Sequence, residues 1–221
     1  MDNVKSRLIN VAAQTWEPLM EGVQAKQLWA DPGTGRRALM TRVDPGFELP
    51  THRHCGDELV FLLDGDLSDE WGKLTAGSIG YRPDGCVHTV SSSNGATAIA
   101  VITGGVEPSS AQLGGPPSEI YDISSIQWTQ ALPGVSIKPV WQDTEARRRV
   151  VLARFEPGSK LPLHRHDGDE LIFVIEGQNE DEAGPVPTGD MSYRPDGCTH
   201  SVWSANGATC LNFVWGDTEM L

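Results

Sequence analysis

Basic side chains are scarce in this 221-residue sequence: 17 Lys and Arg stand against 30 Asp and Glu, a formal net charge of -13. Most of such a surface would repel a phosphate backbone, so nucleic acid is not an expected partner. No uninterrupted apolar run approaches the roughly 18 residues of a membrane-spanning helix, and the N-terminus lacks the apolar segment of a secretory signal. We therefore expect a soluble, cytoplasmic protein with no membrane partner.

Cysteine is also sparse. The sequence has Cys55, Cys86, Cys198 and Cys210, with no C-x-x-C spacing. Four such residues are too few for a disulfide framework in a chain of this length. We expect reduced thiols.

A long helical period is missing as well. Short apolar runs such as ELVFLL and ATAIAVI alternate with turn sequences such as DPG, PDG and SNG. Short runs separated by Gly, Asp, Asn and Pro are typical of antiparallel strands. The sequence therefore predicts an all-β fold.

The chain repeats itself at an offset of 112 positions. HRHCGDEL from His52 returns as HRHDGDEL from His164, and YRPDGCVH from Tyr81 returns as YRPDGCTH from Tyr193, without a gap. A repeat of this length predicts one complete domain in each half. We expect a first domain with an N-terminal arm at 1–104, a linker rich in Pro, Gly and Ser at 105–119, and a second domain at 120–221.

Every histidine of the sequence lies inside these repeated motifs. Imidazole is the commonest metal ligand in proteins, and two side chains of an H-x-H pair in a strand project from the same face. Six histidines at matched positions therefore predict metal ligands rather than isolated core residues. They are His52, His54 and His88 in the first half, and His164, His166 and His200 in the second.

A carboxylate follows each H-x-H pair, at Glu58 and Glu170. In a fully extended chain Glu58 would lie about 20 Å from His52, so the chain must turn near Gly56 before both side chains can reach one ion. We expect three imidazoles and one carboxylate to bind one divalent transition metal in each half, with Zn, Fe, Mn and Ni as the candidate ions.

Other repeated side chains flank these ligands. Alternation along a strand puts Cys86 on the face of His88 and Cys198 on the face of His200. These thiols are either redox-sensitive neighbours of the metal or small core residues. A Tyr-Arg pair precedes each PDG turn and either orients an anionic or enolate substrate or serves the turn alone; the two pairs are Tyr81 with Arg82 and Tyr193 with Arg194.

Two segments of each half resemble the two cupin signatures. In the first half they read Gly46-(five residues)-His52-x-His54-(three)-Glu58-(six)-Gly65 and Gly77-(five)-Pro83-x-Gly85-(two)-His88. The second half repeats them at Gly158, His164, His166, Glu170 and Gly177, and at Gly189, Pro195, Gly197 and His200. The resemblance implies two tandem cupin barrels of the double-stranded β-helix, or jelly-roll, type.

The run GDLSDEWG from Gly65, together with the short gap between the motifs, resembles the cupin of ChrR-type anti-sigma factors. Similar cupins occur in iron-dependent dioxygenases that cleave β-diketones, such as acetylacetone, or aryl ketones. A complete ChrR regulator also has an N-terminal zinc domain with an H-x-x-x-C-x-x-C arrangement that binds the sigma factor. That arrangement is absent from this sequence, so we do not expect a sigma factor as partner.

Three functions are compatible with these patterns. Zinc with four protein ligands would form a closed site suited to a metal-dependent sensor or regulator, which is our first expectation. Iron(II), which favours six ligands, would leave two positions for O2 and substrate in a dioxygenase. A barrel kept only for structure is the third. The expected partner is a small-molecule ligand or an oxidant, and the protein is a monomer or a homodimer.

Overall fold

The computed structural model describes residues 5–111 and 113–221. Within these ranges nearly all regular structure is β-strand, and the single helical element is a 3-10 turn, η1 (Ile123–Ser125). The prediction of an all-β fold is confirmed. No helix in the described part of the chain is long and apolar enough to cross a bilayer.

The chain divides into two compact units. The first, here called the N-terminal unit, is Gln14–Ser125. Its strands are β2 (Glu17–Met20), β3 (Val23–Asp31), β4 (Arg36–Val43), β5 (Phe47–Cys55), β6 (Glu58–Asp69), β7 (Gly72–Thr75), β8 (Ser78–Arg82), β9 (Val87–Ser92), β10 (Ala96–Ile102), β11 (Gly105–Pro108) and β12 (Glu119–Asp122).

The second, the C-terminal unit, combines Ile126–Leu221 with the N-terminal segment up to Ala13. Its strands are β1 (Arg7–Ile9), β13 (Thr129–Leu132), β14 (Val135–Asp143), β15 (Arg148–Phe155), β16 (Ser159–Asp167), β17 (Glu170–Asp181), β18 (Gly184–Pro187), β19 (Met191–Arg194), β20 (Thr199–Ser204), β21 (Ala208–Trp215) and β22 (Asp217–Met220).

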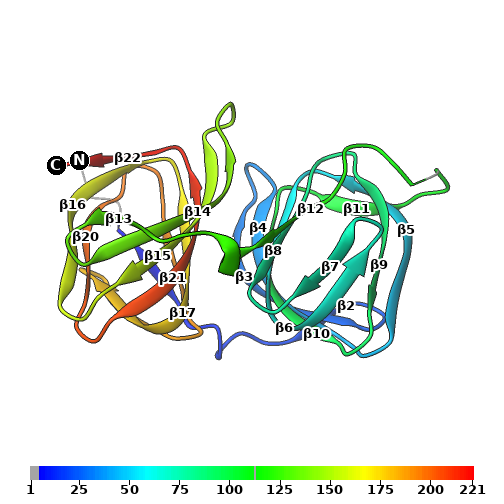
Figure 1. The fold of residues 1–221 in the computed structure, drawn as a ribbon, viewed down its shortest axis with the longest axis horizontal. Helices are drawn as coiled ribbons and strands as arrows, with labels where there is room; N and C mark the ends of the chain where they lie inside the picture. The colour runs from blue at the N-terminus through cyan, green and yellow to red at the C-terminus, as the bar shows by residue number, and fades with distance from the viewer. Residues whose placement is uncertain (1–4, 112) are drawn as a thin grey trace. The chain divides into compact units, whose positions relative to one another are not determined.

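Both units use the same antiparallel topology. The strand order is β11-β5-β9-β6-β10-β4-β3-β2 in the first and β22-β16-β20-β17-β21-β15-β14-β13 in the second. Figure 1 shows each sheet curled on itself, so that side chains of alternate positions face a common interior. Apolar residues fill part of each interior, with Leu62 and Leu74 fully buried in one unit and Val174 in the other. The two predicted cupin barrels are therefore present.

The division of the chain differs from the expected domain limits at both ends of the first repeat. Strand β1 was expected to belong to the first domain, but it pairs with β19 of the C-terminal unit. The expected linker contains β11, whose residues Gly105 to Pro108 pair with β5. The last residue of the expected linker, Glu119, is the first residue of β12, which pairs with β8. The arm and the expected linker thus supply backbone hydrogen bonds to strand edges that would otherwise be unpaired. Local composition does not show which strand edges need such a partner.

Candidate metal centres

Strand pairing brings the three histidines of the N-terminal unit together. His52 and His54 lie on one face of β5, and His88 stands opposite His52 on β9. All three side chains are buried, and one ring nitrogen from each lies within 4.8 Å of the others. The Nε2 atoms of His54 and His88 are 2.9 Å apart.

The C-terminal unit repeats this geometry. His164 stands opposite His200 in the pairing of β16 with β20, and His166 lies on the same face. The three rings form a second buried group with ring nitrogens within 4.8 Å, and Nε2 of His166 lies 2.9 Å from Nε2 of His200.

A glycine corner brings the carboxylate back toward each group. Gly56 has a φ of 131°, and a Cβ placed there would lie 2.9 Å from the backbone nitrogen of Gly104, so no other residue fits without a shift. Beyond the corner, Glu58 lines the same cavity as His52 and His54. This is the turn that the sequence required between the histidines and the glutamate.

The two glutamates do not sit alike. Glu170 places Oε2 3.5 Å from Nε2 of His166, whereas Oε2 of Glu58 is 3.9 Å from Nε of Arg82. Among the described residues, the groups of candidate ligand atoms within 4.8 Å of one another contain the histidines alone. The histidines thus form two compact donor sets, and the assignment of Glu58 and Glu170 as ligands stays a prediction.

The hydrogen bonds of the histidines fit a bound cation. Nδ1 of His52 lies 3.0 Å from the carbonyl oxygen of Pro50, and Nδ1 of His164 lies 2.9 Å from that of Pro162. A carbonyl only accepts hydrogen bonds, so each Nδ1 carries the proton and each Nε2 presents a lone pair to the group. Converging imidazole nitrogens at this spacing suit an ion with metal–nitrogen bonds of about 2 Å.

Burial keeps these rings neutral. Loss of solvation lowers the pKa of His54 and of His166 to about 4, and it also lowers the pKa of His52 and of His164. Metal binding requires an unprotonated nitrogen, so the rings need no further proton loss near neutral pH.

A buried aspartate that sequence reasoning missed supports each group. Asp69 Oδ2 lies 3.5 Å from Nδ1 of His88 and 3.4 Å from Nη2 of Arg82, and it accepts a hydrogen bond of 2.8 Å from Oγ of Ser118. Burial opposes its charge, but its contacts with His88, Ser118 and Arg82 outweigh that effect and lower its pKa to about 2. Asp69 therefore remains a carboxylate beside the histidine.

Asp181 has the same role in the C-terminal unit. Its Oδ2 lies 3.3 Å from Nδ1 of His200 and 3.2 Å from Nη2 of Arg194. The signal that could have found both aspartates was the repeat itself, because Asp69 and Asp181 differ by the same 112 positions as the histidines.

The tyrosines serve the corner before each glutamate. Tyr81 donates a hydrogen bond of 3.1 Å to Oδ1 of Asp57, and Tyr193 donates one of 2.8 Å to Oδ1 of Asp169. Neither tyrosine is among the residues that line the cavities. For the tyrosines, these contacts agree with a role in supporting the turn and not with a role in orienting a substrate.

The arginines and the two cysteines next to the histidine strands are buried. Arg82 and Arg194 are 2% and 0% exposed, and of the two only Arg82 lines a cavity. Cys86 and Cys198 are fully enclosed, and burial raises the pKa of both thiols. Near neutral pH they are therefore protonated, weakly reactive neighbours of the histidine strands.

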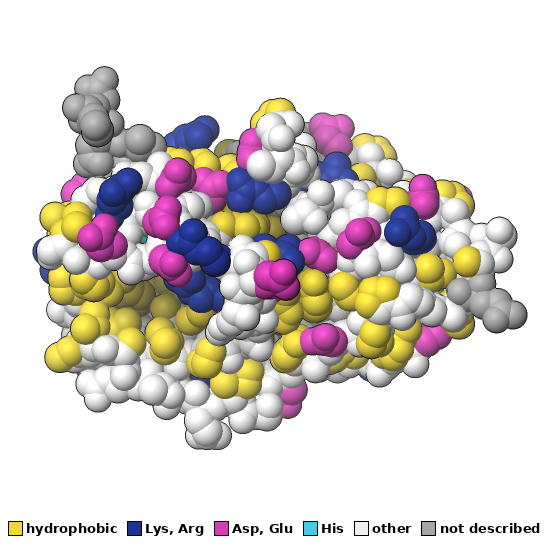
Figure 2. Space-filling model, turned by 90° about the horizontal axis from the view of Figure 1, so that it is seen from above, with side chains coloured by type: hydrophobic (Ala, Val, Ile, Leu, Met, Phe, Trp, Pro, Cys, Tyr) yellow, Lys and Arg dark blue, Asp and Glu magenta, His cyan; other side chains and the backbone are white. Residues whose placement is uncertain are grey.

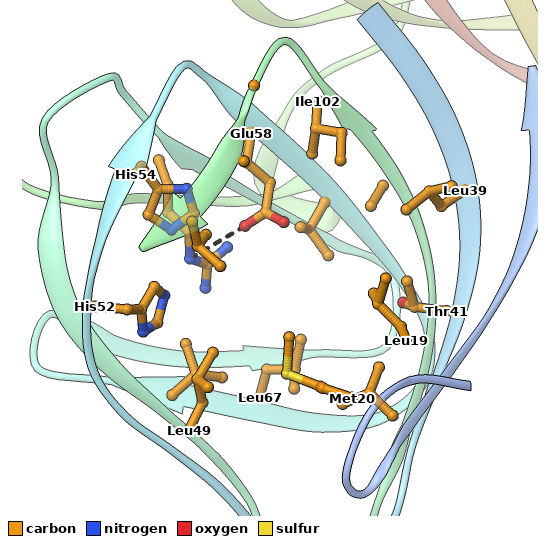
Figure 3. Close-up of a pocket in the computed structure, with 18 of the residues that line it drawn as sticks. Leu19, Met20, Leu39, Thr41, Leu49, His52, His54, Glu58, Leu67 and Ile102 are labelled. Atoms are coloured by element: carbon orange, nitrogen blue, oxygen red, sulfur yellow. Dashed lines mark ion pairs between the residues drawn. The ribbon is translucent and has the colours of Figure 1, made fainter. Parts of the chain in front are cut away.

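Each histidine group opens into a cavity. The cavity of the N-terminal unit measures about 340 Å³ and that of the C-terminal unit about 230 Å³. Figure 3 shows His52, His54 and Glu58 on one side of the first cavity, with apolar side chains facing them. Those labelled are Leu19, Met20, Leu39, Leu49, Leu67 and Ile102. The arrangement can hold a metal ion at the edge of an apolar pocket.

Comparison with known proteins agrees with this architecture. Residues 4–107 and 117–216 each match the family model described as the ChrR Cupin-like domain. No curated protein sequence matches the chain significantly.

Solved structures share the fold at low sequence identity. A structure described as a putative dioxygenase from Nostoc punctiforme superposes with a TM-score of 0.84 at 15% identity, covering 97% of this chain and 84% of that one. Oxalate decarboxylase from Bacillus subtilis at pH 4.6 superposes with a TM-score of 0.72 at 16% identity, covering 100% of this chain and 79% of that one.

Proposed function

The chain is a member of the ChrR cupin-like family and carries two copies of its domain, and we propose that it is a metal-dependent dioxygenase acting on an apolar β-diketone or aryl ketone. The observation that carries this proposal is the apolar cavity of about 340 Å³ that opens directly onto His52, His54 and Glu58. A site built only to hold zinc for structure has no need of such a space beside its ligands.

The cavity wall favours an apolar substrate. Leu19, Met20 and Val106 line it and remain 37–49% exposed, so apolar surface continues to solvent. A ligand with an alkyl or aryl body would remove this surface from water, which contributes favourably to binding. The same wall would limit the access of water to the reacting centre.

Arg82 supplies hydrogen-bond donors at the metal end of the cavity. Its side chain is buried, and its Nε and Nη1 atoms have no hydrogen-bond partner among the described residues. Buried donors without partners are unfavourable, and an enolate oxygen of a bound diketone would satisfy them. This supports the substrate-orienting alternative for Arg82.

The bound ion would supply the oxygen chemistry, since iron(II) held by the protein ligands retains open positions for O2 and for a chelating ketone. The chain's own contribution is positioning. His52, His54 and His88 hold the ion, Asp69 keeps the His88 ring oriented, and the apolar wall places the substrate body.

Oxygen uptake tests the proposal. Protein reconstituted anaerobically with Fe(II) should consume O2 when acetylacetone or a hydroxylated aryl ketone is added, with one O2 used per ketone cleaved. Arg82→Gln should raise KM more than it lowers kcat, because it removes donors to the enolate. His52→Ala combined with His54→Ala removes the N-terminal centre, and the same protein with His164→Ala and His166→Ala added serves as the control without a metal centre. Absence of O2 uptake by the Fe(II)-loaded protein with acetylacetone and with hydroxylated aryl ketones would refute the proposal.

A sensor is the second candidate, and one contact favours it. Ser118, next to the start of β12, donates its hydrogen bond to Asp69, which lies beside His88. A change at the metal could thereby reach a strand at the edge of the sheet. Tightly bound zinc in the purified protein, with no O2 uptake after iron loading, would support this candidate over the dioxygenase.

A further inference from the structure

The two cavities differ in chemistry although the same motifs build both. Residues at matched positions of the repeat change from apolar to amide: Leu67 corresponds to Asn179, and Ala100 corresponds to Asn212. Both asparagines line the cavity of the C-terminal unit, which is also the smaller of the two. Burial of an amide is unfavourable unless the amide is hydrogen-bonded, so each asparagine lowers the stability of the barrel relative to an apolar residue unless it finds partners.

Asn179, one of the residues that line the cavity, has an unpaired buried atom. Its side chain is 1% exposed, and its Nδ2 donates to Sγ of Cys210 at 3.4 Å. Its Oδ1 has no hydrogen-bond partner among the described residues. A buried carbonyl-type oxygen beside a cavity is a position that a donor from a ligand would satisfy.

Asn212 points to the same kind of ligand. Its Nδ2 donates to the backbone oxygen of Val151 at 3.0 Å and contacts that of Cys210 at 3.4 Å. With the amide nitrogen held by the backbone, the oxygen of this side chain is the atom left for a ligand. The two asparagines therefore offer acceptors from two strands, β17 and β21.

The buried arginines of the two units also differ in their hydrogen bonds. Each nitrogen of the Arg194 guanidinium has a protein partner: Nη1 donates to Oγ of Ser192 at 2.6 Å, Nη2 donates to Asp181 at 3.2 Å, and Nε donates to Nδ1 of His200 at 3.2 Å. At the matched position in the N-terminal unit Gly80 replaces that serine, and Nη1 of Arg82 is left without a partner in the described part of the chain. The first cavity thus offers unused donors, and the second offers unused acceptors.

We propose that the C-terminal centre takes a different ligand from the N-terminal one: a small metal-chelating molecule that carries a hydroxyl group donated to Oδ1 of Asn179. The inference rests on the proposed function in one respect, that each centre binds a chelating carbonyl ligand at its metal. The N-terminal centre, with Leu67 and Ala100 at the matched positions, favours the ligand without the hydroxyl.

Two matched probes test the preference. Hexane-2,4-dione and 1-hydroxypentane-2,4-dione both chelate a divalent metal and differ only by a methyl or a hydroxyl group at one end. Protein loaded with redox-inactive Zn²⁺ is titrated calorimetrically, and His52→Ala with His54→Ala removes the N-terminal centre. The hydroxylated probe should bind this protein at least about tenfold more tightly than its methyl counterpart, the effect of one buried hydrogen bond.

Exchange of the matched residues provides the control. Asn179→Leu should abolish the preference for the hydroxylated probe. Conversely, Leu67→Asn in protein whose C-terminal centre is removed by His164→Ala with His166→Ala should create that preference in the N-terminal cavity. Equal binding of both probes by the C-terminal centre, or an unchanged preference in Asn179→Leu, would overturn the proposal.

A ligand-independent measurement separates this inference from the proposed function. If Asn179 is kept for a ligand, Asn179→Leu removes an unpaired polar atom and should leave Tm of the Zn²⁺-loaded protein unchanged or raise it. A clear fall in Tm would make Asn179 a structural residue and overturn the inference, even if the ketones bind. Failure of both probes at both centres, with Tm raised in Asn179→Leu, would count against the ketone class and leave a hydroxylated ligand supported.

Discussion

At the scale of single residues, Asp69 connects the metal ligands to the rest of the N-terminal barrel. Its carboxylate lies between the His88 ring and the Arg82 guanidinium, and none of the three is more than 2% exposed at its side chain. Because solvent does not screen charges at this buried position, the carboxylate offsets the positive charge of the arginine, which would otherwise repel a bound cation. Asp69 is therefore expected to tune metal affinity.

Removal of this charge should weaken metal binding in one unit only. We expect Asp69→Asn to lower the affinity of the N-terminal centre for Zn²⁺ by about 10- to 100-fold, a common effect of losing a carboxylate behind a ligating histidine. Competition with a chromophoric chelator measures it. Asp181→Asn is the matched control and should affect the other centre. An unchanged affinity in both variants would contradict the role given to these aspartates.

The thiols should differ sharply in reactivity. Burial raises the pKa of Cys210 to about 12, and Cys86 and Cys198 are enclosed, whereas Cys55 is exposed. Alkylation needs an accessible thiolate, and a raised pKa removes the thiolate at pH 8. Brief iodoacetamide treatment of the folded protein at pH 8 should label Cys55 alone, as mass spectrometry of peptides would show. Equally rapid labelling of Cys210 would contradict its enclosure.

The residues predicted from the sequence and the residues that were missed differ in whether a sequence pattern indicates their role. All six histidines could be identified because the repeat left none outside the motifs. Asp69 was missed although the repeat marks it as well, because aspartate is usually a surface residue and the fold is needed to show that its side chain is buried. Asn179 was missed for the same reason, since an amide in a strand carries no pattern that reveals an unpaired oxygen.

At the scale of elements, β1 and β12 are equivalent arms of the two repeats. Arg7 and Glu119 begin them at the same repeat position, yet β1 pairs with β19 and β12 pairs with β8. Each arm also brings a serine toward a buried aspartate: Ser118 bonds to Asp69, and Ser6 contributes to lowering the pKa of Asp181. Each arm is thus part of the barrel formed by the other repeat.

Deletion of the first arm should disturb the unit that is distant in sequence. A chain that begins at Asn10 loses the pairing of β1 with β19, so amides of residues 191–193 should exchange hydrogen faster and the C-terminal unit should melt at a lower temperature. Hydrogen–deuterium exchange mass spectrometry measures this. The amides of β8, still covered by β12, are the internal control. Faster exchange in β8 instead of β19 would contradict the assignment of the arm.

Sequence patterns predicted the strands well but not the partners of the arms. Alternating apolar runs between Gly and Asp turns mark strands such as β6 and β10, because local chemistry decides them. The destination of Arg7–Ile9 depends on which sheet edge is open in three dimensions, and three residues carry no signal for that choice. Strand β11 was predicted to be part of a linker. Its four residues are all exposed, so they show no apolar alternation that would indicate a strand.

At the scale of the whole molecule, duplication has produced two centres with separate supports. Each histidine group has its own aspartate, its own buried arginine and its own cavity. The excess of negative charge is not concentrated at one place on the face in Figure 2, where acidic and basic side chains lie interspersed. Local ligands, rather than a general acidic surface, should therefore govern metal binding.

The centres should lose metal independently. His54→Ala should lower metal content by about one equivalent per chain and His166→Ala by another, because each ring belongs to a separate group of three imidazoles whose loss leaves the other group intact. Elemental analysis of the purified variants after dialysis gives the stoichiometry, and the double variant should hold almost none. Loss of both ions from either single variant would show that the two centres depend on each other, because occupied sites in separate barrels with separate ligands have no physical reason to empty together.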